Sequence, residues 1–285
     1  MKELNTYITE KLKLNKDSGD KYNYNYYPED KKELRAIIKQ LISERGPDAD
    51  LNDIDVSDIT NMYQLFYDLK PHNIDISEWD VSNVENMDSM FIWCENFNAD
   101  LSRWNTKSLK NMDSMFCGCK SFNSDLSKWD VSKVQKMDNL FDRCKSFNSD
   151  LSEWDVSNCK SMICTFNECA IFNSDISKWD TSNVTTMKGM FQLCDNFNQP
   201  IGKWNVSKVK DMRYMFNECR KFDQPLGKWD VSQLTQATFM FMNAYRFDQL
   251  LDDWDIKSLK KAMLMFKGSK MEYNVPNWYI GWKNK

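Results

Sequence analysis

A 25-residue unit is repeated along most of this chain, and this repetition constrains the fold more than any other feature of the sequence. Counted from a Trp that we use as the reference position, Met returns at positions 8 and 11, Phe at positions 12 and 18, and Cys at position 15. One unit buries too few side chains to offset the conformational entropy of ordering it, so units become stable only when they stack. The reference residues are Trp79, Trp104, Trp129, Trp154, Trp179, Trp204, Trp229 and Trp254.

We expect nine stacked units over residues 51–275, with like side chains lying on like side chains along one continuous core. The first and last units lack several of the repeated residues, as expected where the outer face is not covered by another unit. Residues 28–50 are predicted to form an N-terminal capping helix that ends at Gly46, and residues 276–285 a C-terminal cap. Residues 1–27 form a leader that need not be ordered.

Two patterns within each unit predict its local structure. The segment L-x-x-W-x-V, at residues 126–131 for example, fits a short strand with Trp129 and Val131 on one face. The apolar residues that follow have the spacing of an amphipathic helix of about three turns, and they are Val134, Met137, Phe141 and Cys144. Ser132 and Gln135 fit a capping box at its start. The predicted fold class is an α/β repeat solenoid, with short parallel strands on one face and short helices on the other.

This pattern resembles known repeat families over about residues 51–270. The segment L-x-x-W-x-V followed by V-x-x-M-x-x-M-F-x-x-C-x-x-F-N resembles the BspA-type leucine-rich repeats, and more closely the mycoplasma-type "WDVSNVTNMSxMF" repeats of unknown function. The resemblance implies a leucine-rich-repeat-like solenoid and a surface or adhesion role, because many relatives are bacterial surface proteins. The first residues, "MKELNTYITEKLKLNKDS", are similar to leaders on proteins of large tailed phages of gut bacteria, which implies a phage protein as an alternative.

Charge and hydropathy limit the partners and the location. The net charge of −4, from 38 basic and 42 acidic residues, does not favour nucleic acid, because its binders usually carry a basic excess. No apolar run is long enough for a signal peptide or a membrane span, so we expect no membrane insertion and a cytoplasmic location. The family resemblance instead implies the cell surface, or association with a virion. We expect a monomer.

Six of the nine cysteines follow the 25-residue spacing. Metal sites need close pairs such as C-x-x-C, so this column predicts buried, reduced thiols and no metal or other cofactor. These residues are Cys94, Cys119, Cys144, Cys169, Cys194 and Cys219. A column of Asn, from Asn98 to Asn198, is predicted to bond the backbone of its own or an adjacent unit. Pro200 and Pro225 enter the same turn and stiffen it.

The residues on either side of the reference Trp are the candidate binding residues. They point away from the core, onto a face that is concave in leucine-rich repeats and that suits a protein or glycan partner. They are Arg103, Lys128, Lys178, Lys203, Lys228, Asp130, Asp155, Asp180 and Asp230. The alternative interpretation is a solvated ladder in which the basic column offsets repulsion within the acidic one. Calcium is not expected, because it needs a compact oxygen-rich loop and these carboxylates come one per unit.

Catalysis finds little support in the sequence. His72 is the only histidine, and the off-column Cys117, Cys159 and Cys164 have no candidate base near them. No pair of aspartates differs from the others in a way that suggests an acid and a base. We therefore expect a non-enzymatic binding protein.

Two other functions stay open. One is a structural component of a virion or cell envelope, and the other is an enzyme acting on polysaccharides with a parallel β-helix fold. The helical spacing within each unit argues against the β-helix. The segment "YNYNYY", residues 22–27, is expected either to contact a partner or to fold back on the capping helix.

Overall fold

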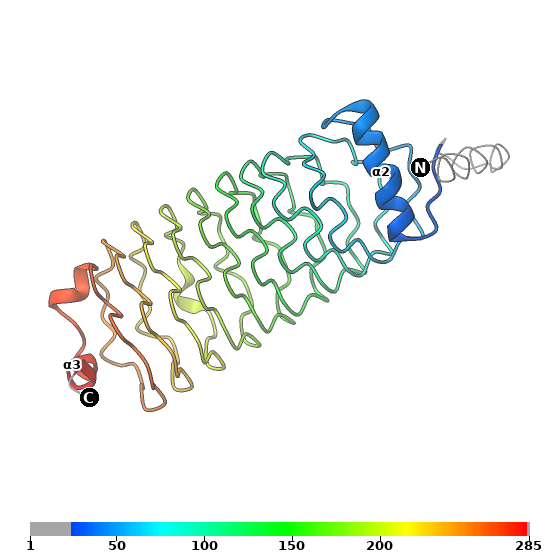
Figure 1. Ribbon diagram of the computed structural model, residues 1–285. Coiled ribbons are helices and arrows are strands. Elements are labelled where there is room, and N and C mark those ends of the chain that lie inside the picture. Colours follow the sequence, from blue (N-terminus) through cyan, green and yellow to red (C-terminus); the bar gives the residue numbers. More distant parts are fainter. Residues whose placement is uncertain (1–23, 284–285) are drawn as a thin grey trace.

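The computed structural model, which describes residues 24–283, is an elongated stack of coils that follow one another along the chain (Figure 1). The helix α2, Lys31–Arg45, lies across the N-terminal end of the stack, and the short helix α3, Asn277–Lys283, lies at the C-terminal end. Two 3-10 helices, η1 at Ile201–Lys203 and η2 at Lys270–Tyr273, complete the helical segments of this range. Residues 1–23, and with them most of the predicted leader, lie outside the described residues.

The predicted alternation of strand and helix within each unit is wrong. Between residues 51 and 275 the coils contain no α-helix, and successive coils are paired through isolated parallel bridges such as Asn61 with Asn86 and Ser161 with Thr186. These bridges lie seven residues after the reference position, inside the segment predicted as helix, while the predicted strand is a turn followed by extended backbone. The fold therefore does not have the strands on one face and helices on the other of an α/β or leucine-rich-repeat-like solenoid.

The helix is absent because alternate backbone N–H groups bond to the next coil instead of their own. The N–H of Asn139 donates to the carbonyl of Ile163 (2.7 Å), and that of Phe141 donates to the carbonyl of Thr165 (2.9 Å). Asn139 and Arg143 also have φ values of 55° and 62°, in the left-handed region. Each such residue turns the chain, so side chains three and four residues apart reach the same core without a helix.

Ser132 does not cap a helix. Its backbone N–H donates to Oδ1 of Asp130 (3.0 Å), and the N–H of Val134 closes a tight turn on the carbonyl of Val131 (2.9 Å). The loss of the helix also removes the argument that separated this chain from a parallel β-helix, although residues 24–283 contain isolated bridges and no continuous strand.

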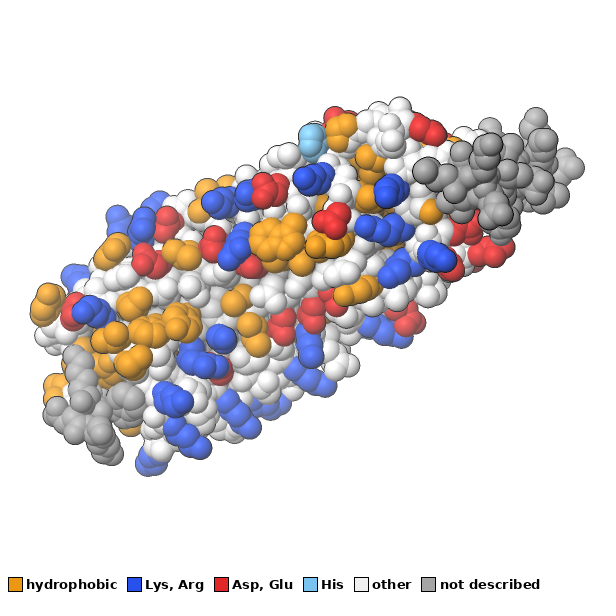
Figure 2. Space-filling model, in the orientation of Figure 1, with side chains coloured by type: hydrophobic (Ala, Val, Ile, Leu, Met, Phe, Trp, Pro, Cys, Tyr) orange, Lys and Arg blue, Asp and Glu red, His pale blue; other side chains and the backbone are white. Residues whose placement is uncertain are grey.

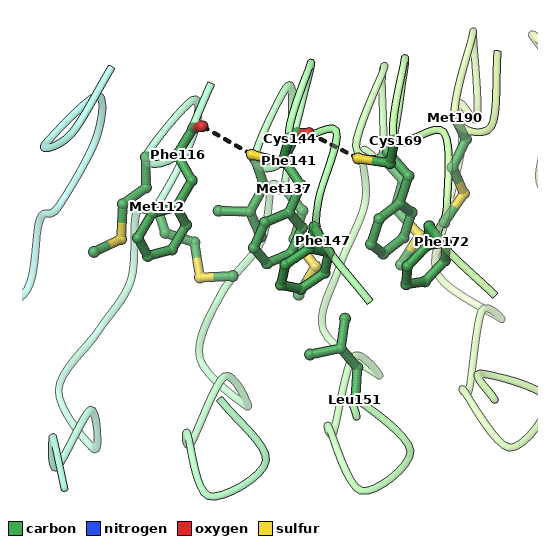
Figure 3. Packing of buried hydrophobic residues seen from close by; sticks show 14 of the residues in the cluster. Met112, Phe116, Met137, Phe141, Cys144, Phe147, Leu151, Cys169, Phe172 and Met190 are labelled. Carbon is green, nitrogen blue, oxygen red and sulfur yellow. Dashed lines mark hydrogen bonds between the residues drawn. The ribbon is translucent and has the colours of Figure 1, made fainter. Parts of the chain in front are cut away.

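The core confirms that like side chains stack in register. Phe116 and Phe141, in successive coils, have ring centroids 5.7 Å apart and nearly parallel planes (Figure 3). The Cys column is buried and reduced, as predicted, and the Sγ of Cys144 donates to the carbonyl of Phe116 in the preceding coil (3.0 Å). Each reference Trp makes a similar link, for example from Nε1 of Trp129 to the carbonyl of Leu101 (3.2 Å). Rings and hydrogen bonds therefore both tie each coil to its neighbours.

The two ends of the stack leave opposite backbone groups without a neighbouring coil, and the caps satisfy them. In the segment around each buried Phe the backbone N–H groups donate to the next coil, so the first coil has open carbonyls there, and Arg35 of α2 donates to those of Gln64 and Tyr67. The last coil has open N–H groups, and that of Met265 donates to the hydroxyl oxygen of Tyr279 in α3 (3.1 Å). The caps thus protect edges that would otherwise pair with another chain.

Aromatic residues at the two ends of the stack join the outermost coils. Tyr279 falls one full period after Trp254, but Trp278 continues the Trp column, with ring centroids 6.2 Å apart and Nε1 donating to the carbonyl of Leu251 (2.8 Å). The described part of the Tyr-rich segment pairs with the first coil, through a parallel bridge between Tyr26 and Ile54. Tyr26 also hydrogen-bonds with the side chain of Arg45 at the end of the capping helix, so this part of the segment folds back on the first coil and on that helix.

Candidate functional site

The structure places all nine predicted binding residues on the surface, but it gives the acidic ones a structural role. Asp130, Asp155, Asp180 and Asp230 each accept, through Oδ1, the backbone N–H of the Ser two residues later (3.0 Å in each case). The side-chain hydrogen bond from this Ser lowers the pKa of Asp180 and of Asp230. These carboxylates hold the turn after each Trp, so their regular spacing reflects the architecture of the coils.

The basic residues of the same surface fall into two groups. Arg103 forms an ion pair with Glu78, and Lys178 forms one with Glu153 (3.3 Å), each across adjacent coils. Lys128, Lys203 and Lys228 make no ion pair with any residue in the described range. Lys203 and Lys228 hold the same position in successive units, so two lysines without an ion pair lie on neighbouring coils.

Three successive units break the repeat next to these two lysines. The position four residues before the Trp is Asp in earlier units, where Asp125 accepts the N–H of Ser127 (2.9 Å), but it becomes Pro200, Pro225 and Leu250. None of these three side chains can accept that hydrogen bond. An apolar strip therefore replaces a row of carboxylates.

The first two of these units also carry Gly202 and Gly227 where earlier units have Ser. A Cβ added to Gly227 would lie 2.8 Å from the carbonyl oxygen of Leu250, and one added to Gly202 would meet the carbonyl of Pro225. The missing side chains let neighbouring turns approach closely and leave space above them. The sequence analysis treated Pro200 and Pro225 only as turn residues, although the joint loss of Asp and Ser was the signal for a different surface.

Together these residues line a groove of about 500 Å³. We call it the 200–250 groove, and its lining is Pro200, Gly202, Lys203, Pro225, Gly227, Lys228, Gln249 and Leu250. Leu250 is 80% exposed. Nε2 of Gln249 donates to Oδ1 of Asp223 in the preceding coil (2.7 Å), which fixes one wall. The groove is apolar along its strip and basic at its edge.

The Asn column links successive coils through hydrogen bonds. For example, the backbone N–H of Asn148 donates to Oδ1 of Asn123 in the preceding coil (2.8 Å).

The cysteines are poorly suited to nucleophilic chemistry. Burial raises the pKa of Cys117 and of Cys159 to about 12, and that of Cys164 to about 11. The reactive thiolate is therefore scarce near neutral pH. His72 lies beside Asn96, with 3.3 Å between Nε2 and Nδ2, and no cluster of three metal-ligating side chains occurs among residues 24–280.

Exposed apolar side chains gather in patches on the face of the molecule shown in Figure 2. On this face the patches lie between lysines, arginines and acidic residues. Within the described residues, no helix has the length and apolarity needed to cross a bilayer. Exposed apolar patches can mark sites of interaction with a partner.

The stacked coils, with one continuous core and surface grooves where the repeat breaks, define a tandem-repeat protein. A family model described as "Mycoplasma protein of unknown function, DUF285" matches residues 37–138, 124–208 and 162–278. The chain belongs to this family. The match supports the mycoplasma-type resemblance and does not extend to the BspA-type leucine-rich repeats.

Comparisons beyond the family add little. No curated protein matches the chain. A solved structure titled "Crystal structure of TLR13-ssRNA13 complex" aligns with 90% of this chain and 55% of that chain, at 11% identity and a TM-score of 0.19. This chain therefore spans about half the length of that protein, and the similarity is too low to support an argument about fold or function.

Proposed function

We propose that this chain is a non-enzymatic binding protein whose 200–250 groove docks an extended, acidic segment of a partner protein. The observation that supports this most is that two kinds of residue line the same groove. Lys203 and Lys228 have no carboxylate partner in the described range, and they lie beside an exposed apolar strip that ends at Leu250. A partner segment that carries carboxylates beside apolar side chains would neutralise the two lysines and cover the apolar strip. Aromatic rings, on which sugars commonly stack, do not line this groove.

The dimensions favour an extended peptide. Chain segments paired side by side lie about 4.8 Å apart, so the three units of the strip span about 10 Å, whereas side chains on one face of an extended peptide lie about 7 Å apart. Two apolar side chains of a partner therefore fit along the strip. Burying the Leu250 side chain would contribute up to about 1.5–3 kcal/mol, and each exposed lysine–carboxylate pair about 0.2–1 kcal/mol.

The test uses a fluorescein-labelled peptide of alternating Glu and Val residues as a probe, measured by fluorescence polarisation. We expect it to bind the wild-type protein and to lose about tenfold in affinity with Lys203→Glu/Lys228→Glu or with Leu250→Ser. Lys107→Glu/Lys128→Glu is the matched control, because it makes the same change of charge at two exposed residues outside the groove.

The proposal is wrong if the probe does not bind, if a Lys–Val peptide binds as well, or if the control lowers affinity equally. Binding should also weaken with added salt, since the ion pairs are exposed. An affinity that is independent of salt and of the two lysines would leave the charge argument without support.

A further inference from the structure

Trp93 is a surface aromatic residue that the repeat does not require. It lies outside the Trp column, and in the other units its position holds small, charged or aliphatic residues such as Gly118, Arg143 and Leu193. Its side chain is 43% exposed. Its backbone has a φ of 60° and donates to the carbonyl of Cys117 in the next coil (2.7 Å), so the residue is fixed on the coil surface.

The next two coils hold the indole ring in place. A Cβ added to Gly118 would lie no more than 3.0 Å from three atoms of the ring, Cε3, Cζ3 and Cδ2, which shows that the ring packs directly against this glycine. The guanidinium of Arg143 lies 5.4 Å from the ring centroid and also pairs with Glu168 (3.3 Å). The ring is therefore supported by the backbone at Gly118. Because it is already held in place, a ligand that binds to its exposed part does not lose affinity by ordering the side chain.

A polar groove of about 390 Å³ adjoins the ring. Its lining is Lys70, Pro71, His72, Trp93, Glu95 and Asn96. Glu95 forms an ion pair with Lys120 (2.7 Å), and Asn96 lies within hydrogen-bond distance of His72. The groove thus offers an ammonium donor, a carboxylate acceptor and an amide that can do both, all within reach of a single ring.

This combination suits one class of ligand. A pyranose ring has an apolar C–H face and a rim of hydroxyl groups, so it can lie on an indole while its hydroxyls bond to surrounding polar side chains. A single-stranded nucleic acid also stacks on Trp, but it requires a basic groove, and the carboxylate of Glu95 lines this one. We propose that Trp93 and the groove beside it bind a hexopyranose unit of a glycan, at a site separate from the 200–250 groove.

The experiment titrates the whole chain with trisaccharides of glucose, galactose, mannose and N-acetylglucosamine, each up to about 10 mM, because contacts to one sugar ring give affinities near the millimolar range. Saturation-transfer NMR reports binding of each sugar. At least one trisaccharide should bind the wild-type protein, and Trp93→Gly should lower its affinity by about tenfold, equivalent to about 1.4 kcal/mol. Gly is compatible with this backbone conformation, because Gly118 and Gly268 occupy the same position in other units.

Two further variants make the test specific. Gly118→Ala keeps the indole but adds a methyl group where the ring now packs, so the ring must move and binding should also weaken. Tyr245→Ala is the matched control, because Tyr245 is another exposed ring beside an arginine, with Arg220 6.0 Å from its centroid, but it lines neither this groove nor the 200–250 groove. The proposal is overturned if no trisaccharide binds, if Trp93→Gly binds as tightly as wild type, or if Tyr245→Ala has the same effect.

Discussion

Replacing Trp154 with Phe tests whether the indole column holds the coils together. The Trp154 side chain is 3% exposed, and its ring lies 6.4 Å from that of Trp179 with planes 2° apart. Its Nε1 donates to the carbonyl of Leu126 in the preceding coil (2.9 Å). Phe keeps an aromatic ring at this place but removes the donor and part of the ring volume.

The expected loss of stability has three parts of similar size. A residual cavity of about 40 Å³ costs roughly 1 kcal/mol at about 24 cal/mol per Å³. The apolar atoms that are removed no longer contribute about 1 kcal/mol of burial. The lost hydrogen bond costs about 1 kcal/mol and not more, because the carbonyl of Leu126 still accepts the N–H of Trp129 (3.1 Å). We therefore expect the free energy of unfolding to fall by about 3 kcal/mol.

The measurement is urea unfolding followed by circular dichroism in the far and near ultraviolet. Both signals are needed, because a long repeat array can lose two-state behaviour when its middle is weakened. Trp93→Phe makes the same chemical change at an exposed ring and should cost less than about 0.5 kcal/mol. A Trp154→Phe variant that unfolds at the same urea concentration as Trp93→Phe would refute the argument that the indole column carries stability.

Three further predictions follow from individual contacts. Near pH 8, a thiol reagent should react slowly with the native protein and with all nine cysteines only in denaturant, because burial raises the pKa of Cys117 to about 12 and that of Cys164 to about 11. Rapid native reaction would contradict this. Burial raises the pKa of Asp113 to about 6, so its native state holds a proton more tightly than the unfolded chain, and this contribution to stability is present below about pH 4 and is lost as the pH rises through 6. Asp113→Asn should flatten that part of the melting-temperature profile, and an unchanged profile would count against it. Gly227→Ala should lower the free energy of unfolding by about 1–3 kcal/mol, because its Cβ would lie 2.8 Å from a carbonyl oxygen, whereas Ser152→Ala at the same repeat position should change it by less than about 0.5 kcal/mol in the same urea titration.

The sequence allowed the stacking to be predicted but not the path of each coil. The 25-residue period is enough to place Phe116 over the ring one unit earlier and to bury the thiols, because identical units can share a core only in register. The same spacing suggested a helix. Buried side chains spaced three, four and three residues apart also result when residues in the left-handed backbone conformation turn the chain. Many residue types adopt this conformation here, so the sequence gives little indication of it.

A weak trace of these turns is nevertheless present in the glycines. Gly118, Gly189 and Gly268 all have positive φ and fall at just two places in the repeat, positions 10 and 14 counted from the Trp. Non-glycine residues at the same positions, such as Asn139 and Arg143, adopt the same conformation. Glycine is favoured where the backbone is left-handed, so its concentration at two positions was evidence against a helix there.

The candidate sites were harder to predict for a related reason. A column that repeats without change, such as the carboxylates represented by Asp130, serves the turn of its own coil and cannot distinguish one place on the stack from another. A binding site in such a protein needs residues that the architecture does not use. Leu250, which replaces a turn-forming Asp, and Trp93, which lies outside every aromatic column, both satisfy this condition.

Substitutions at the two candidate sites should therefore remove binding without lowering the stability of the protein. Because neither Leu250 nor Trp93 lies in the continuous core, replacing either one by a residue that other units carry at the same position should leave stacking intact. A chain with Leu250→Asp and Trp93→Gly should melt within a few degrees of wild type, since surface changes usually cost less than about 0.5 kcal/mol. It should at the same time lose both the acidic peptide and the trisaccharide. A large drop in melting temperature would show instead that these departures from the repeat stabilise the stack, and that their exposure has a structural cause.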